Sequence, residues 1–318
     1  MLRPGGVAAT MLLAVTGCTG DPGPPAPEAT GLVWQRLSPM PTPRTEVAAA
    51  VTDGRIVVAG GFAEPDRTVA TVESYDISSD SWSPLPDLPV AVNHAMAASL
   101  AGEVYVFGGT LGDGMLSDAA FVFRDGRWHT LPPMPEPRTA GGAAVAAALI
   151  YVVGGVGPAG VAERTLVLDP AAGRWSVAEG LGTPREHMGV GGLEDRVYAV
   201  GGRARSLAGF ANAEVLDPVS GTWTALPDLP TPRGGMAATA TSNGFVVAAG
   251  GEEEGGTFDE VEAFDVEAER WIGLPPMPTA RHGLGVVADG TTVYVIAGGV
   301  DPGLSFSGAV EAIDLARL

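Results

Sequence analysis

Residues 54–61 read GRIVVAGG, an apolar run that follows a turn-forming Asp53-Gly54 pair and ends in two glycines. Six such double glycines recur at nearly fixed intervals along the chain, and each has a tryptophan partner at a nearly constant distance. Self-similarity at a fixed period predicts a repeat architecture. The glycine pairs are Gly60-Gly61, Gly108-Gly109, Gly154-Gly155, Gly201-Gly202, Gly250-Gly251 and Gly298-Gly299, and the tryptophans are Trp34, Trp82, Trp128, Trp175, Trp223 and Trp271.

One repeat, residues 44–86, contains four short strand patterns and no helical pattern. A run of small apolar residues spans 45–51, a hairpin signal follows at Asp53-Gly54, and a buried strand spans 55–59. Residues 71–76 alternate as a third strand, and a fourth contains Trp82. We expect four antiparallel strands, A to D in chain order. Segments with the same pattern are 92–132, 138–178, 185–227 and 233–275.

The residue types fit a radial arrangement of these repeats. Strand A is built from small residues such as Ala48-Ala49-Ala50 and Gly191-Gly192, as expected where all repeats crowd around one axis. The double glycine after strand B permits backbone angles and close approach that a side chain would block. An aspartate six residues before a tryptophan suits an Asx-type turn between strands C and D. These aspartates are Asp76, Asp169, Asp217 and Asp265.

Pro-Arg before strand A, Gly-Gly after strand B, Tyr-Asp ending strand C and Trp on strand D together resemble the kelch repeat. The resemblance covers residues 31–318 and rests on six ordered copies. It implies an all-β fold, a six-bladed kelch β-propeller with four antiparallel strands in each blade. It also implies that function lies in loops on one face, commonly as a protein-binding or scaffold module.

The spacing also predicts how the ring closes. From each tryptophan to the next glycine pair the distance is 26 or 27 residues, but no tryptophan follows Gly298-Gly299. The strand around Trp34 is therefore expected to complete the last blade beside residues 309–315. Such closure removes the open sheet edge.

The first 30 residues have the pattern of a bacterial lipoprotein leader. The apolar run 7–15 is too short to span a bilayer, and residues 15–18, Val-Thr-Gly-Cys, resemble a lipobox. We expect a signal peptide at 1–17, a lipidated Cys18 with a Pro-rich tether at 18–30, and the propeller at 31–318. The predicted location is extracytoplasmic, attached to a bacterial membrane through Cys18.

Composition narrows the function further. The formal net charge is -19, so a nucleic-acid partner is not expected, because phosphates would be repelled. Cys18 is the only cysteine, which rules out a disulfide within the chain. Kelch propellers of the galactose-oxidase type use copper and a cysteine-crosslinked tyrosine, and a cysteine placed in the lipobox cannot supply that crosslink. We expect no cofactor and a monomer.

Five repeats begin strand A with an arginine, whereas the second has Val92 at that position. The arginines are Arg44, Arg138, Arg185, Arg233 and Arg281. Resemblance to kelch propellers suggests an arginine-lined face that binds an acidic peptide or acidic sugar, with Arg203 and Arg205 adding charge. The alternative is structural: each arginine bonds carbonyls or the strand-C glutamate of its own blade. Those glutamates are Glu73, Glu214, Glu262 and Glu311.

Glu46, His94 and His187 each lie two positions after the arginine position, so their side chains share a strand face and could approach one channel. We do not expect a metal site, and we assign no catalytic residue. Enzymatic activity stays open as an alternative. Six-bladed kelch propellers include bacterial sialic-acid mutarotases, and in that alternative Glu46 or His187 would act as acid or base.

Overall fold

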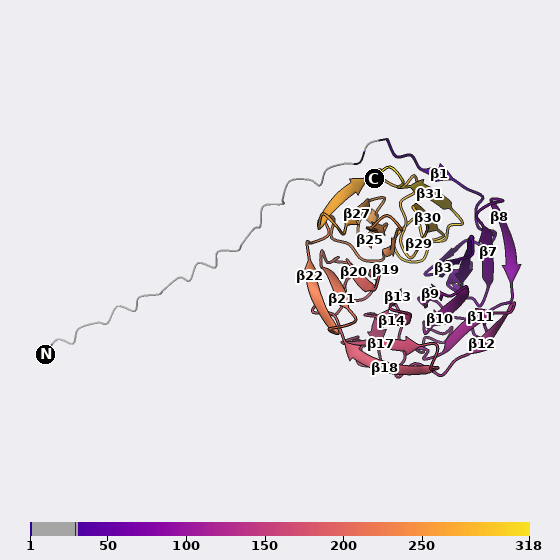
Figure 1. Cartoon of the computed structure of the whole chain (residues 1–318), viewed down its shortest axis with the longest axis horizontal. Helices are drawn as coiled ribbons and strands as arrows, with labels where there is room; N and C mark the ends of the chain where they lie inside the picture. The colour runs from indigo at the N-terminus through magenta and orange to yellow at the C-terminus, as the bar shows by residue number, and fades with distance from the viewer. Residues whose placement is uncertain (2–28, 30) are drawn as a thin grey trace.

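The computed structural model describes Met1, Ala29 and residues 31–318, so the predicted signal peptide after Met1, Cys18 and all of the tether except Ala29 lie outside the described residues. The all-β fold predicted from the sequence is confirmed. The described residues form six four-stranded antiparallel sheets, arranged as blades around one axis (Figure 1). Within the described part of the chain, no helix is long and apolar enough to cross a membrane.

The blades follow one another along the chain, and each runs outward from strand A near the axis to strand D at the rim. Blade 1 contains β3 (Ala48–Thr52), β4 (Arg55–Ala59), β7 (Val72–Asp76) and β8 (Ser81–Leu85). Blade 2 contains β9 (Met96–Leu100), β10 (Glu103–Phe107), β11 (Ala120–Arg124) and β12 (Arg127–Thr130). Blade 3 contains β13 (Gly142–Ala146), β14 (Leu149–Val153), β17 (Arg164–Asp169) and β18 (Arg174–Glu179).

Blade 4 contains β19 (Gly189–Leu193), β20 (Arg196–Val200), β21 (Ala213–Asp217) and β22 (Thr222–Leu226). Blade 5 contains β23 (Ala237–Ala240), β24 (Phe245–Ala249), β27 (Val261–Asp265) and β28 (Arg270–Leu274). Blade 6 contains β29 (Gly285–Asp289), β30 (Thr292–Ile296), β31 (Val310–Asp314) and β1 (Gln35–Arg36).

Blade 6 combines the two ends of the described chain. Strand β1 pairs antiparallel with β31, with Gln35 opposite Ala312 and Arg36 opposite Glu311. In Figure 1 the indigo β1 lies beside the yellow β31. The strand before the first repeat therefore supplies strand D of the last blade.

The tryptophans link each blade to the preceding one. Every indole Nε1 donates a hydrogen bond to a backbone carbonyl about one repeat earlier in the ring. Trp82 donates to Ser38 at 2.9 Å, and Trp34 donates across the closure to Pro275 at 2.8 Å. The other pairs are Trp128 with Pro86, Trp175 with Pro132, Trp223 with Glu179, and Trp271 with Pro227. Each indole thus joins two blades through its bond and its apolar ring.

The apolar core lies between neighbouring sheets rather than inside any one of them. One cluster, for example, combines Val58 and Tyr75 of blade 1 with Ile296 and Val310 of blade 6. The predicted Asx turns between strands C and D are confirmed. The side chain of Asp169 accepts the Ala172 N–H at 2.8 Å, and Asp76, Asp217 and Asp265 make the same kind of bond.

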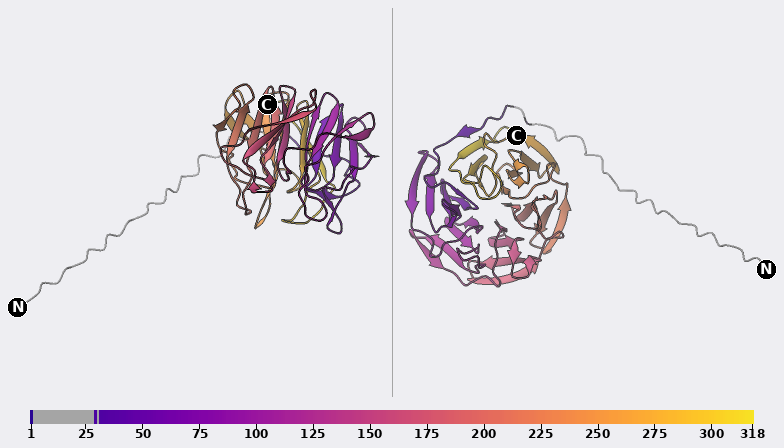
Figure 2. Two further views of the ribbon diagram at one scale, coloured as in Figure 1. Left: turned by 90° about the horizontal axis from the view of Figure 1, so that it is seen from below. Right: turned by 180° about the vertical axis from the view of Figure 1, so that it is seen from behind.

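Because the strands alternate in direction, the D–A and B–C connections share one face, and the A–B and C–D turns share the other (Figure 2). Short two- and three-stranded sheets lie on the face that carries the D–A and B–C connections. They are β2 (Arg44–Thr45) with β5 (Phe62–Ala63) and β6 (Arg67–Thr68), β15 (Val156–Gly157) with β16 (Gly160–Val161), and β25 (Glu252–Glu253) with β26 (Gly256–Thr257). We call this side the loop face.

Candidate functional site

Six residues with left-handed backbone conformation, one from each blade, form a hydrogen-bonded ring around the axis at the loop face. Their φ angles lie between 51° and 71°. Each N–H donates to the carbonyl of its counterpart in the preceding blade at 2.7–3.0 Å, and the Glu46 N–H closes the circle on the Gly283 carbonyl. The members are Glu46, His94, Ala140, His187, Gly235 and Gly283. We call this the axial ring.

The axial ring fixes where its side chains begin. A non-glycine residue in this backbone region carries strain of about 1–3 kcal/mol, and such strain is concentrated at functional sites. Glu46, His94 and His187 are three of the four non-glycine members. Their side chains converge on the axis, with one possible ligand atom from each lying within 4.8 Å of the others. The expectation that these three approach one channel is therefore confirmed.

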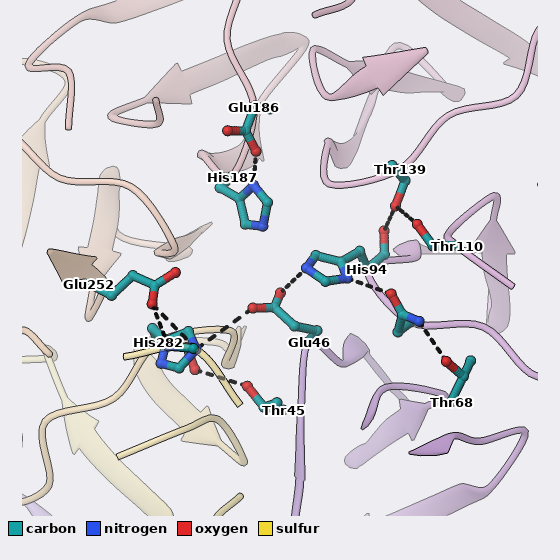
Figure 3. A network of polar contacts seen from close by, with 12 residues as sticks. Thr45, Glu46, Thr68, His94, Thr110, Thr139, Glu186, His187, Glu252 and His282 are labelled. Atoms are coloured by element: carbon teal, nitrogen blue, oxygen red, sulfur yellow. Dashed lines mark hydrogen bonds and ion pairs between the residues drawn. The ribbon is translucent and has the colours of Figure 1, made fainter. Parts of the chain in front are cut away.

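These three belong to a wider set of polar side chains, and Figure 3 shows all of its members except Arg203. We call it the axial mouth, and it comprises Glu46, His94, Glu186, His187, Arg203, Glu252 and His282. Five of the six blades contribute to it. Glu186 and His282 come directly before axial-ring residues, and Arg203 and Glu252 come directly after double glycines.

Ion-pair contacts connect the axial mouth into one network. Glu46 lies between two imidazoles: its Oε2 is 3.2 Å from His94 Nε2, and its Oε1 is 3.9 Å from His282 Nε2. His282 Nε2 is also 3.6 Å from Glu252 Oε2. Arg203 then joins Glu252 at 2.8 Å to Glu186 at 3.5 Å.

In both axial-ring histidines, a side-chain oxygen of the preceding residue lies close to the ring nitrogen Nδ1. His94 Nδ1 lies 2.6 Å from the Asn93 side-chain oxygen, and His187 Nδ1 is in ion-pair contact with Glu186. The Asn93 oxygen accepts a hydrogen bond, so His94 Nδ1 carries the hydrogen and His94 Nε2 is left for the axis. The two rings pack edge to face, with centroids 5.0 Å apart.

Burial has the largest effect on the pKa of His187. Burial holds its pKa well below the ordinary histidine value, and the positive charges of His94, Arg203 and His282 act in the same direction. His187 is therefore neutral near pH 7, with a lone pair on one ring nitrogen. Burial by itself raises the pKa of Glu252, but His282 and Arg203 outweigh it, so this pKa lies below its usual value and the group is a carboxylate.

Behind the mouth, an axial channel of about 280 Å³ is enclosed by the six A strands. Its walls are mostly small residues, including Ala48, Ala98, Ala144, Gly191 and Ala238. Polar chemistry is therefore concentrated at the loop-face end, where the axial ring lies.

The five repeat arginines do not line this opening. All five are fully buried inside their own blades. Arg44, for example, donates to the Gly60 carbonyl at 2.7 Å and pairs with Glu73 at 2.8 Å. The corresponding pairs are Arg185 with Glu214, Arg233 with Glu262, and Arg281 with Glu311. This geometry agrees with the structural alternative, not with an exposed arginine-lined surface.

Two blades depart from this pattern in an informative way. In blade 3 the strand-C position holds Leu166, and Arg138 pairs instead with Glu136 of its own D–A connection. In blade 2 both partners are apolar, because Val92 replaces the arginine and Phe121 replaces the glutamate. The guanidinium–carboxylate pair is thus a packing element that an apolar pair can replace.

Comparison with known proteins agrees with this architecture. The family model described as the KLHDC2/KLHL20/DRC7 Kelch-repeats domain matches residues 30–202, and a Kelch motif model matches residues 184–230. The chain belongs to the kelch-repeat family. Mouse Kelch-like protein 35 is 31% identical over 172 residues, which are 54% of this chain and 29% of that protein.

Kelch-like protein terF of Aspergillus terreus is 29% identical over 219 residues, which are 62% of this chain and 48% of that protein. This kelch chain therefore covers less than half of the length of either relative. A solved structure titled "Structure of YjhT" superposes with a TM-score of 0.72, covering 87% of this chain and 99% of that one. At 16% identity, that likeness concerns the fold alone.

The kelch propeller separates the residues selected from the sequence into three groups. Glu46, His94, His187 and Arg203 meet at the axial mouth, the five repeat arginines are buried inside their blades, and Arg205 is exposed on the blade-4 B–C loop. Sequence reasoning did not select Glu186 or Asn93. The available signal was position, because each directly precedes a predicted channel-facing histidine.

Proposed function

We propose that this kelch propeller is a binding module that holds a protein partner on its loop face. The observation that carries the proposal is that the axial mouth lies at the centre of the face bearing all six B–C loops. Exposed apolar side chains stand on the same loops: Met115 in blade 2, and Val300 and Leu304 in blade 6. Apolar anchors around a polar centre are a common interface composition.

The anionic preference expected from the arginines is not part of this proposal. Those arginines are engaged inside their blades, and Arg203 is the one guanidinium of the axial mouth, against three carboxylates. The kelch relatives support a protein as the kind of partner. Its identity is the subject of the experiment.

A photo-crosslinking amino acid placed at Met115 or Leu304 of the full chain, expressed in its native cells, tests the proposal. We expect a discrete protein adduct from both positions. Val219, which is more exposed still but lies on a C–D turn of the other face, is the matched control and should give no adduct. Adducts from position 219 alone, or from none of the three, would contradict the assignment.

A second candidate is acid–base isomerisation of a carboxylated sugar, of the sialic-acid mutarotase type. The observation favouring it is that Glu46 and neutral His187 converge with His94 at one opening. Anomer exchange of sialic acid, followed by NMR, should be accelerated by the protein and slowed again by Glu46→Gln. No acceleration at high protein concentration would eliminate this candidate.

We also propose that the chain acts outside the cytoplasm, attached to a membrane through a lipid on Cys18. The support is the sequence pattern of residues 1–18. Cys18→Ala should leave the precursor unprocessed or release the protein into the soluble fraction. Unchanged processing and membrane retention would refute the anchor.

A further inference from the structure

We propose that Glu46, His94 and His187 form a binding site for one divalent first-row transition-metal ion, such as Zn²⁺. Two imidazoles and one carboxylate are a ligand set that Zn²⁺ takes in proteins, with at least one position left for water or a ligand. This site is independent of the protein partner proposed above, which is expected to contact the loops.

The distances suit a site that closes on an ion. The three ligand atoms lie within 4.8 Å of one another, and tetrahedral ligands about 2.0–2.1 Å from Zn²⁺ are about 3.4 Å apart. Side-chain rotation covers this difference, since each residue has at least two rotatable bonds. The backbone is held by the hydrogen bonds of the axial ring, so the site needs no backbone movement.

The neighbours of the two histidines orient both rings for metal binding. A metal-ligating histidine almost always gives its other ring N–H to a carboxylate, carbonyl or water. Here the Asn93 oxygen takes that position for His94, and the Glu186 carboxylate lies in ion-pair contact with Nδ1 of His187. Asn93 is held in turn by the Thr68 hydroxyl at 2.7 Å. His94 Nε2 faces the Glu46 carboxylate at 3.2 Å.

That contact already brings together an imidazole nitrogen and a carboxylate oxygen, two groups that both bind divalent metal ions. An ion would replace the hydrogen between them and bind both. The wider charge balance points the same way. Glu46, Glu186 and Glu252 have side chains 12%, 9% and 5% exposed, and Arg203 is the guanidinium among them. Buried carboxylates require compensation, which a divalent ion would complete.

The test is a titration of the full chain, freed of metal with a chelator, with Zn²⁺ by calorimetry and with Co²⁺ by visible absorption. We expect one equivalent of either ion to bind, and bound Co²⁺ to show the intense bands of a four- or five-coordinate site. The absence of saturable binding would overturn the proposal.

Ligand variants locate the site. His94→Ala and His187→Ala should fold, because Ala140 already occupies the corresponding position of blade 3 with a φ of 53°. Each should weaken Zn²⁺ binding by more than the about 10- to 100-fold expected when an outer partner is lost, as in Glu186→Gln. Glu46→Gln, which keeps the side-chain shape, should also abolish tight binding.

His129→Ala is the matched control, because His129 lies on β12 at the rim of blade 2. It should bind Zn²⁺ as the wild type does. Equal weakening in the control, or full affinity in both His94→Ala and His187→Ala, would show that the ion binds elsewhere and would refute the site. Partner crosslinking from Met115 is a separate readout, so each proposal can fail independently.

Discussion

Replacing Arg233 with valine tests whether the repeat arginines hold the blades together. The guanidinium is fully buried, donates to the Gly250 carbonyl at 2.7 Å and the Thr231 carbonyl at 2.8 Å, and pairs with Glu262. Arg233→Val removes these bonds together. It leaves Glu262 as a buried carboxylate with the Thr231 hydroxyl as its remaining side-chain donor.

The expected cost is large. Removing one partner of a buried ion pair destabilises a protein by about 3–5 kcal/mol, because the other charge is left buried and unpaired. Whole domains are stable by about 5–15 kcal/mol, so this is a substantial fraction. At roughly 2–4 °C for each kcal/mol in a large domain, the melting temperature should fall by roughly 6–20 °C.

Thermal unfolding followed by fluorescence or calorimetry measures this change. Arg270→Ala, an exposed arginine of the same blade, is the control and should shift the free energy of unfolding by no more than about 0.5 kcal/mol. The double variant Arg233→Val with Glu262→Phe copies the Val92 and Phe121 pair of blade 2. It should recover part of the loss, because no charge is left unpaired.

The reasoning would be refuted by an Arg233→Val protein that melts within about 2 °C of the wild type. Such a small shift lies far below the range expected for a stranded buried charge. A double variant less stable than the single variant would refute the charge argument in particular, and would assign the loss to packing.

Three further predictions concern the repeat elements. Gly154→Ala should lower the melting temperature clearly more than Gly221→Ala. Both glycines have positive φ, but a Cβ at Gly154 would lie 2.6 Å from a backbone carbonyl oxygen, whereas a Cβ at Gly221 would meet open space. Equal melting temperatures would contradict this prediction. Trp34→Ala should lower the melting temperature, because it removes the packing of the indole and its hydrogen bond to the Pro275 carbonyl across the ring closure. Limited proteolysis should then cut first near β1. Unchanged protection of β1 from proteolysis would count against the closure role. Hydrogen bonds from the Tyr75 hydroxyl and a backbone N–H lower the pKa of Asp80. The stabilising effect of this carboxylate is therefore present above its unfolded pKa of about 3.9 and is lost as pH falls through the folded pKa. Asp80→Asn should reduce the loss of stability in acid, and an unchanged dependence of stability on pH would exclude this contribution.

The sequence was sufficient for the fold because each repeat carries its own local signals. Double glycines with φ as large as 133°, as at Gly251, permit close approach to the next blade, and the Asp-containing turns are set by bonds two or three residues away. The spacing of Trp34 from the first glycine pair also predicted its pairing with the C-terminal strand. Such features are readable because the interactions are local or repeat at a fixed period.

The site was only partly predictable. Their common position, two residues after the repeat arginine position, was enough to place Glu46, His94 and His187 on one channel, although they lie in the axial ring just before the A strands. The same position pattern did not show that the arginines two residues earlier turn into the blade and meet their glutamates. Whether a side chain faces the axis or the blade depends on the backbone conformation of the axial ring, which no single repeat specifies.

The sequence by itself determined an all-β kelch propeller, its repeat boundaries and the face on which its loops lie. Only the tertiary structure decided which polar residues meet. Glu46 meets His94 and His282, and Glu252 meets His282 and Arg203, because closing the ring brings residues of five blades around one axis. The physical reason is that these contacts are non-local: they exist once the axial ring of hydrogen bonds is complete, and no repeat alone contains them.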